Sequence, residues 1–501
     1  MTTRHFDVLI IGAGLSGVGA AYHLQKHCPG KSFAILEGRQ RMGGTWDLFR
    51  YPGIRSDSDM YTLGYSFRPW THGKAIADGP SILEYVRTTA RTHGIDQKIH
   101  FGQWATRYSW NSEEARWTVE TRSQQGNEEP QTRRFTCNFL INCSGYYRYD
   151  QGYTPEFPGR ERFEGKVIHP QHWPEDLDYK GKRVVIIGSG ATAVTLVPAM
   201  TRDAAHVTML QRSPSYVVSL PDVDAIAQAL QRLLPTKLAY QVTRWKNVST
   251  QTLFFQACKR FPKLMRKLIR WQTRRELGPD FDVDTHFNPS YDPWDQRLCL
   301  VPNGDLFRAL RKGEASVVTD QIDTFTRDGI RLFSGQEIKA DIIVTATGLS
   351  LVALGGAELE LDGRPVSLPD TMSYKGMMLS DVPNLALVVG YTNASWTLKA
   401  DLTDEYVCRL INYMDEHDYD VCVPASDPRV NEAPFLDLNS GYVHRALEHL
   451  PKQGDRAPWR LYQNYLLDLI KLRFGTVDDQ VMRFTRAPGK EMRGEAADRA
   501  A

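Results

Sequence analysis

The chain of 501 residues has little of what several protein classes depend on. Its seven cysteines are scattered and form no C-x-x-C pair, which argues against a disulfide framework, a zinc ribbon and a dithiol redox centre. Its apolar runs are far shorter than the roughly 20 residues that a membrane-spanning helix needs. Its charges nearly balance, with 61 Lys and Arg residues against 59 Asp and Glu residues, so no overall field favours nucleic acid as a partner.

Other features are missing as well. A strand-like run begins at Phe6, which leaves no room for a signal peptide, so we expect a cytoplasmic protein. The His and Cys residues show no ligand spacing, and no metal site is predicted. What remains is an ordinary globular composition, 42% hydrophobic and 24% charged, in a chain long enough for two to four domains.

Two segments repeat the same order of a buried strand, a glycine-rich turn and a helix. The first has its strand at 6–11, the turn GAGLSG at 12–17 and a second strand at 31–36. The second has its strand at 183–187, the turn GSGATA at 188–193 and a second strand at 206–211. Near-continuous apolar strands indicate parallel sheets covered on both faces. We predict an α/β fold with two Rossmann-like, doubly wound dinucleotide-binding domains.

The second of these domains is predicted to be nested in the first. Strands at 138–145 and 341–348 end in small residues where the chain can cross between domains. The segment between Pro221 and Pro289 is helical and basic, which indicates a helical insertion. The predicted divisions are the first domain at 1–145 and 341–490, the second at 146–220 and 291–340, the insertion at 221–290 and a flexible tail at 491–501.

The first glycine-rich turn is typical of a site for an unphosphorylated nucleotide. Gly12, Gly14 and Gly17 permit a sharp turn, close approach of the backbone to a pyrophosphate, and tight packing of helix on strand. Glu37 ends the second strand, where a carboxylate can accept both ribose hydroxyls and would repel a 2′-phosphate. This unit suits FAD or NAD.

The second turn reverses this preference. Arg212 and Ser213 stand at the matching strand end, and an Arg fork with a hydroxyl suits a 2′-phosphate; a surface arginine is the alternative. An FAD-type site and an NADP-type site in one chain favour hydride transfer from NADPH to flavin, and without a C-x-x-C pair oxygen is the expected electron acceptor. The predicted contacts of this unit are Gly188, Ser189, Gly190, Thr192, Ala193, Arg212 and Ser213.

Two longer patterns resemble a known family. The run FEGKVIHPQHWP at 163–174 fills F-x-G-x-x-x-H-x-x-x-W-P, and the segment 43–57 fills G-G-x-W-x-x-x-x-[FY]-P-[GM]-x-x-x-D. Both patterns are those of type I Baeyer–Villiger monooxygenases, and the chain resembles the mycobacterial ethionamide-activating branch. The resemblance covers nearly the whole chain.

The resemblance implies a reaction. It implies an FAD-containing, NADPH- and O2-dependent enzyme that converts lipophilic ketones to esters or lactones through a flavin C4a-peroxide, and that also oxidises thioethers and thioamides. It assigns Arg297 as the cation that stabilises peroxide and tetrahedral oxyanion, and Asp57 as the acid that orients it. Surface placement of Arg297 and helix capping by Asp57 are the alternatives. Residues implied at the flavin are Gly44, Thr45, Trp46 and Asp57.

The fingerprint residues are expected to couple domain movement to catalysis. They are Phe163, Gly165, His169 and Trp173, and simple packing of a linker is a second interpretation. Flavin-containing monooxygenases of the heteroatom-oxidising type usually have Phe or Tyr where Trp173 stands, which favours ketone oxidation here. Sulfur or nitrogen oxygenation without ketone activity is the alternative function. A flavin-binding sensor or peripheral membrane protein without turnover would not need Asp57 with Arg297.

One segment of the insertion, 260–275, reads as a basic amphipathic helix. Phe261, Leu264, Met265, Leu268 and Ile269 share one helical face, and Lys and Arg cover the rest. Such a helix can lie in an anionic membrane surface, which would place the protein at the inner face of the cell membrane. The alternative is that the apolar face packs into the core.

Overall fold

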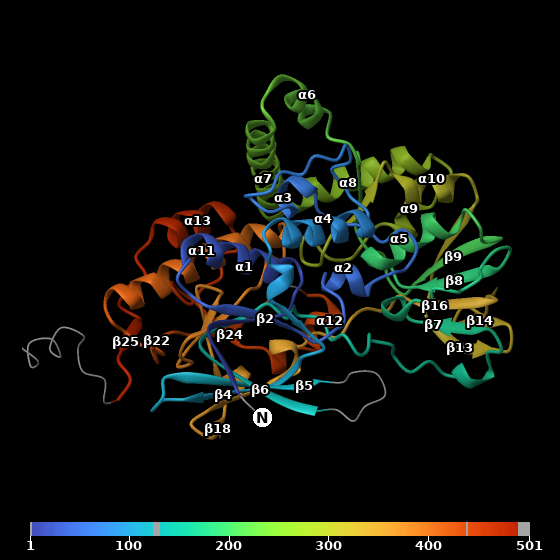
Figure 1. Ribbon diagram of the computed structural model, residues 1–501. Helices are drawn as coiled ribbons and strands as arrows, with labels where there is room; N and C mark the ends of the chain where they lie inside the picture. The colour runs from blue at the N-terminus through green and yellow to red at the C-terminus, as the bar shows by residue number, and fades with distance from the viewer. Residues whose placement is uncertain (1–2, 124–130, 437–438, 489–501) are drawn as a thin grey trace, which may run out of the picture.

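The computed structural model describes residues 3–123, 131–436 and 439–488, and contains two α/β units, each with its own sheet (Figure 1). The first unit lies to the left and below in this view, the second lies to the right, and helices of the insertion stand at the top. This arrangement confirms the predicted α/β fold with two Rossmann-like units. The predicted tail at 491–501 lies outside the described residues.

The first sheet has nine strands and carries the first glycine-rich turn. They are β1 (Arg4–Ile11), β2 (Phe33–Glu37), β3 (Ile99–Phe101), β4 (Trp104–Asn111), β5 (Arg116–Ser123), β6 (Gln131–Asn142), β17 (Glu358–Leu361), β18 (Arg364–Pro365) and β21 (Leu385–Leu387). The central strand β1 pairs in parallel with β2 and β6, while β4, β5 and β6 form an antiparallel extension. Strand β21 comes from far along the chain and pairs in parallel with β6.

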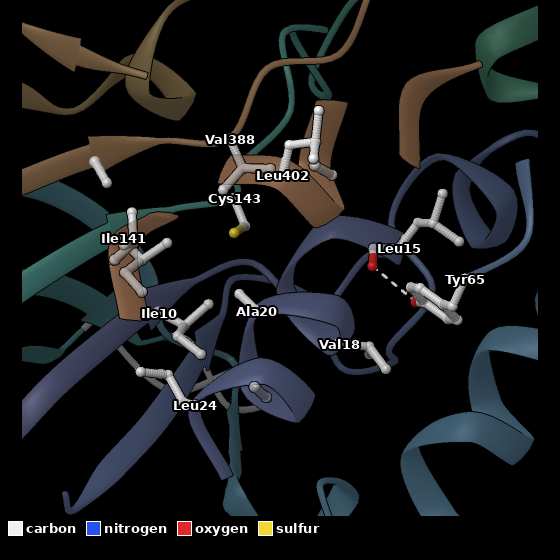
Figure 2. Packing of buried hydrophobic residues seen from close by; sticks show 14 of the residues in the cluster. Ile10, Leu15, Val18, Ala20, Leu24, Tyr65, Ile141, Cys143, Val388 and Leu402 are labelled. Atoms are coloured by element: carbon white, nitrogen blue, oxygen red, sulfur yellow. Dashed lines mark hydrogen bonds between the residues drawn. The ribbon is translucent and has the colours of Figure 1, made fainter. Parts of the chain in front are cut away.

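The core of the first unit lies between this sheet and two helices, α1 (Leu15–His27) and α11 (Trp396–Glu416). Figure 2 shows Ile10 of β1 and Ile141 of β6 packed toward Leu24 of α1 and Leu402 of α11. The hydroxyl of Tyr65 donates a hydrogen bond of 2.7 Å to the carbonyl of Leu15 at the start of α1. Burial on both faces explains why β1 ends in an unbroken apolar run.

The second sheet is wholly parallel, with the strand order β12-β9-β8-β16-β7. Its strands are β7 (Lys166–Ile168), β8 (Arg183–Ile187), β9 (His206–Gln211), β12 (Ala315–Thr319) and β16 (Ile342–Thr345). On one face pack α5 (Ala191–Met200) and α10 (Asp305–Arg311). On the other lies a three-stranded meander of β13 (Ile322–Thr326), β14 (Gly329–Leu332) and β15 (Glu337–Lys339).

One predicted boundary is wrong. The division between 340 and 341 assigns the strand at 341–348 to the first domain, but Ile342 of β16 pairs with Val184 of β8 in the second sheet. All four residues of β16 are buried, as a central position in a parallel sheet requires. The chain therefore returns to the first unit only after Thr345, where β17 pairs with β4. An apolar run does not reveal which of two sheets it joins, because that depends on contacts far along the chain.

The insertion contains four helices, α6 (Ala225–Leu233), α7 (Thr236–Arg260), α8 (Pro262–Leu277) and α9 (Val283–His286). The predicted apolar face of α8 is only partly core. Ile269 is buried against Tyr216 and Leu298, whereas Phe261, Leu264 and Leu268 are exposed. Among the described residues, no helix combines the length and apolar composition needed to cross a bilayer.

Candidate active site

A cleft of about 1210 Å³ opens at the carboxyl ends of β1 and β2, where ligands bind in folds of this type. Its walls come from both units, from the segment that follows Gly43, and from the segment that follows β6. The predicted site residues that line it are Gly12, Gly14, Glu37, Gly44, Thr45, Trp46, Asp57, Thr192 and Arg297.

The first glycine-rich turn leaves no room for a side chain at Gly12 or Gly17. Gly12 has a φ of +98°, and a Cβ there would lie 2.6 Å from the carbonyl oxygen of Cys143. A Cβ on Gly17 would lie 1.9 Å from the carbonyl oxygen of Gly12. Gly14 caps α1 without a side chain and lies against Gly44. The backbone and the N-terminus of α1 are thus free to meet an anion.

Glu37 is buried at the edge of this turn, with 5% of its surface exposed. One carboxylate oxygen accepts a hydrogen bond of 2.8 Å from the Ala13 amide, and the other accepts one of 2.9 Å from the Arg39 amide. Burial raises the pKa of Glu37, and these two amides oppose the rise. Carboxylate oxygens have further acceptor capacity toward the cleft. The turn, Glu37 and the volume of the cleft fit FAD.

The segment 43–57 ties the flavin side of the cleft to the second unit. Gly44 has a φ of +55° and begins α2 (Thr45–Leu48), and Trp46 packs on the first core while lining the cleft. A Cβ on Gly53 would lie 2.7 Å from that of Ala199 on α5, so only glycine permits this approach. Tyr51 is hydrogen-bonded to Thr192, and burial raises its pKa to about 12.

The segment 55–59 has a charged side chain at every second position. Each of the three, Arg55, Asp57 and Asp59, pairs with a different part of the chain. Arg55 makes a two-pronged ion pair with Asp305 of α10. Asp57 pairs with Arg297, with 2.8 Å between carboxylate oxygen and guanidinium nitrogen. The structure thus brings together the two residues that the resemblance assigned to catalysis.

Asp59 anchors this segment to the insertion. Its two carboxylate oxygens accept hydrogen bonds of 2.8 Å from Asn247 and 2.7 Å from Gln251, both on α7. The same side chain caps α3 (Met60–Leu63) by accepting from the Thr62 amide. The helix-capping alternative considered for Asp57 therefore falls to Asp59 instead.

Arg297 faces the cleft with about 35% of its side chain exposed, and Asp57 with 32%. The Asp57 carboxylate raises the pKa of Arg297 above its already high value, against the effect of burial. Tyr146 and Tyr147 add to the rise. Their hydroxyls lie 2.9 Å apart and both rings line the cleft. Arg297 is accordingly a permanent cation at the wall of the cleft.

The second glycine-rich turn is more open. A Cβ on Gly188 would lie 2.3 Å from the carbonyl oxygen of Ala346, but Gly190 has open space around it. Ser189 donates a hydrogen bond of 3.2 Å to the carbonyl of Ser213, which brings the turn beside the end of β9. Arg212 is exposed there. Ala193 is buried under the turn. These residues fit a dinucleotide with a 2′-phosphate that enters from solvent.

The fingerprint residues lie at the crossings between the units. The Nε2 of His169 is 3.1 Å from the carbonyl oxygen of Gly348, and its Nδ1 accepts from the Gln171 amide, so Nε2 carries the proton. Burial lowers the pKa of His169. The side chain of Gln171 donates to the carbonyl of Arg148 at 2.7 Å. The segment 169–171 thus bonds to both stretches in which the chain passes between the units, 146–150 and 346–348.

The other fingerprint residues pack. Phe163 is 5% exposed and meets Phe325 edge-on, with ring centroids 6.2 Å apart. A Cβ on Gly165 would lie 2.5 Å from the carbonyl oxygen of Asp341. Trp173 is half-buried against the core of the second unit.

Sequence reasoning missed several site residues. Gln171 stands at a variable position of the fingerprint, and Tyr146 and Tyr147 follow β6 without a motif. The polar run at 55–59 was a signal, because charged residues at alternate positions can point to different partners. Asn247 and Gln251 of α7 had no signal, since they are two polar residues of a long helix.

Comparisons with known proteins agree with this geometry. The sequence profile described as "Flavin-binding monooxygenase-like" matches residues 75–352, and that of an "NAD(P)-binding Rossmann-like domain" matches residues 10–73. The chain is 59% identical over 490 residues to the FAD-containing monooxygenase EthA of Mycobacterium tuberculosis, covering 97% of this chain and 99% of the relative. It is 54% identical over 486 residues to EthA of Mycolicibacterium smegmatis, covering 97% and 98%.

Solved structures share the fold. A steroid monooxygenase described as oxidised and bound to NADP aligns with a TM-score of 0.75 and 22% identity, over 96% of this chain and 100% of that one. An open form of cyclohexanone monooxygenase aligns with a TM-score of 0.73 and 19% identity, over 96% and 100%.

Proposed function

The chain belongs to the flavin-binding monooxygenase-like family and is an NADPH-dependent flavin monooxygenase, and we propose that its reaction inserts one oxygen atom beside the carbonyl of a lipophilic ketone. The product is an ester or lactone, and thioethers and thioamides are second substrates. Bound FAD would supply the redox chemistry, namely acceptance of a hydride from NADPH and activation of dioxygen. The observation that carries the proposal is the Asp57–Arg297 pair at the wall of the cleft.

Residues of the chain orient the substrate-facing cation and stabilise the developing charge. Asp57 engages one nitrogen of the Arg297 guanidinium, which orients its remaining N–H donors toward the cleft. The guanidinium stabilises negative charge that develops on the carbonyl oxygen of the substrate, where a fixed cation lowers the barrier more than water does. Because its pKa is raised, Arg297 does not give up its proton in this role.

The first experiment measures products. Full-length protein with FAD, NADPH and air is given linear ketones, cyclic ketones and thioethers, and the products are identified by mass spectrometry. We expect Arg297→Ala to oxidise NADPH and release hydrogen peroxide while ester formation falls roughly 100- to 1000-fold. Asp57→Asn keeps the shape of the side chain and is expected to lose part of the ester yield.

Arg308→Ala is the matched control, because Arg308 lies on α10 outside the cleft and bonds only a backbone carbonyl in the described chain. Ester formation by Arg297→Ala at the parent's rate would contradict the assigned role. Sulfoxides without ester from any ketone would leave the heteroatom oxygenase as the function.

We also propose that the insertion contacts an anionic membrane surface and takes lipophilic substrate from it. Four apolar side chains of α8 and its flank are 47–59% exposed, namely Phe261, Leu264, Leu268 and Trp271. Lys263 and Lys267 are exposed beside them, whereas Arg270 and Arg274 pair with Asp284. On α7, Leu238, Trp245 and Leu253 are exposed too. Apolar side chains among free cations suit a surface of anionic lipid.

Co-sedimentation with vesicles of phosphatidylglycerol and phosphatidylcholine tests this contact. At roughly 1 kcal/mol for each cation near such a surface, Lys263→Glu with Lys267→Glu should weaken binding at least about 30-fold. Leu264→Ser with Leu268→Ser should also weaken it, while Lys182→Glu in the second unit should not. Equal binding by all variants, or no binding by the parent, refutes the contact.

A further inference from the structure

A second cavity, of about 270 Å³, lies beside the cofactor cleft in the first unit. Tyr391 lines both spaces and is itself buried, so its ring stands between them. The second cavity is lined by residues 375–376 between β19 (Ser373–Tyr374) and β20 (Met378–Leu379), by 389–391 after β21, by the start of α11, by the loops at 435–436 and 457–463, and by α13 (Tyr465–Leu469) with the segment that follows it. None of the predicted site residues lines it.

Four charged side chains that line this cavity form two ion pairs. Lys399 is buried, and its ammonium lies 2.9 Å from the carboxylate of Asp468, which also accepts a hydrogen bond of 2.7 Å from Tyr391. Lys375 lies 3.0 Å from the carboxylate of Asp479. Each carboxylate therefore has its own cation, and both are committed to it.

The mouth of the cavity is different. Arg460 and Lys471 are exposed there, and both lie over the ring of Tyr462, at 5.4 and 3.8 Å from its centroid. Among the described residues, neither cation has a carboxylate partner within 4.0 Å, so the mouth carries two uncompensated positive charges. The walls beside it are apolar, formed by Phe435, Leu461 and Leu472.

The backbone around the cavity is held in an unusual conformation. Lys375 has a φ of +51° and Gln463 a φ of +48°, in the left-handed region that side chains rarely adopt. Gln463 is fixed by the Thr392 amide, which donates 3.1 Å to its side-chain oxygen. Strained residues of this kind gather where a structure holds a ligand site in place.

We propose that this cavity is a second binding site, for a small anionic amphiphile such as a short-chain carboxylate. The carboxylate pairs with Arg460 and Lys471 at the mouth, and the apolar chain lies against Phe435, Leu461 and Leu472. The volume of the cavity, just below the usual range of ligand pockets, limits the occupant to a small molecule. Neither Asp57 nor Arg297 lines this cavity, so binding there can be measured separately from the proposed reaction.

Isothermal titration of the full-length flavoprotein with hexanoate and with neutral hexanamide tests the proposal. We expect hexanoate to bind at least about tenfold more tightly than hexanamide, since a charge-assisted bond is worth at least that factor. Arg460→Gln with Lys471→Gln should weaken hexanoate about tenfold or more and leave hexanamide and the flavin spectrum unchanged. Arg483→Gln, an exposed cation outside the cavity, is the matched control.

Equal affinity for the two probes, no hexanoate binding, or equal weakening by Arg483→Gln overturns the proposal. Two sources supply such an acid group, a substrate and a separate effector, and kinetics distinguish them. Hexanoate that competes with a keto acid and leaves a neutral ketone unaffected supports the first source. Hexanoate that changes turnover of the neutral ketone as well supports the second. Loss of ester formation alone leaves the binding result intact.

Discussion

The first glycine-rich turn is enclosed by distant parts of the chain, whereas the second is open to solvent. Around the first, Gly44 and Cys143 approach the turn closely and Glu37 is buried. Around the second, Gly190 has free space and Arg212 is exposed. The same local motif thus makes two kinds of site. We infer that the enclosed one suits a cofactor that stays bound, and the open one suits a cofactor that exchanges in each turnover.

The two units also differ in where they hold charge. Among the described residues, the buried carboxylates are all in the first unit: Glu37, Asp47, Asp401, Asp404 and Asp468. The second unit holds its acidic side chains nearer the surface, as in the ion pair of Asp341 with Arg183. The first unit should therefore respond more strongly to changes in packing and in pH.

The largest expected effect comes from the third position of each turn. Gly17→Ala places a Cβ 1.9 Å from the carbonyl oxygen of Gly12, so the turn must shift, and we expect loss of flavin-loaded protein. The second unit already has Ala193 at this position, and Ala193→Gly should cost only about 1–2 kcal/mol. The ratio of flavin to protein absorbance and the unfolding temperature check both. Normal flavin content in Gly17→Ala would show that the two turns do not differ in their need for glycine at this position.

Arg212→Ala should give the next largest effect, confined to the open site. Loss of a charged contact to phosphate costs about 1.5–3 kcal/mol, so the KM for NADPH should rise roughly 10- to 100-fold. The KM for NADH and the flavin content should stay unchanged. In contrast, Glu37→Gln should lower flavin content. If NADPH and NADH change equally, Arg212 is not at the phosphate.

The smallest effect concerns pH. Burial, with Asp401 and Glu405 nearby, raises the pKa of Asp404 well above its ordinary value, and neither of its oxygens has a hydrogen-bond partner in the described chain. The unfolded chain releases this proton at a lower pH than the folded chain does, so stability is lost as pH rises above the ordinary pKa of the carboxyl group. Asp404→Asn should therefore lose less stability than the parent as pH rises from 5 to 8.

Asp341 serves as the control for this prediction. Hydrogen bonds from Arg183 lower its pKa to about 2, so it contributes stability above its ordinary pKa that is lost only as pH falls toward 2. The destabilisation caused by Asp341→Asn should thus be constant between pH 5 and 8. Thermal unfolding across this range distinguishes the two, and a constant gain for Asp404→Asn would contradict the buried neutral carboxyl.

Local signals explain what could be predicted from the sequence. The strands β8 and β9 begin and end where the sequence placed them, since each is a short apolar run between turn residues. Asp57 and Arg297 could be paired only through the resemblance, because 240 positions separate them and no spacing rule joins them. The family patterns thus supplied long-range information that periodicity lacks.

What could not be predicted depends on contacts between distant segments. Packing between the units decides which sheet β16 joins and which side of α8 is exposed. It also decides that Gln171 bonds to the carbonyl of Arg148, where the chain first passes from one unit to the other. Apolar residues on one face of a helix predict that this face is buried, and Ile269 is buried as predicted. How many of the other apolar residues are buried depends on the area that neighbouring elements cover.

The nesting of one unit in the other sets an order of assembly during synthesis. The inner sheet is complete once β16 has been made, at Thr345, whereas the outer core also needs α11, which ends at Glu416. At about 5–20 residues per second, the ribosome needs roughly 4–14 seconds to add the residues between these points. We expect a nascent chain to fold the second, inner unit first and to bind flavin only afterwards.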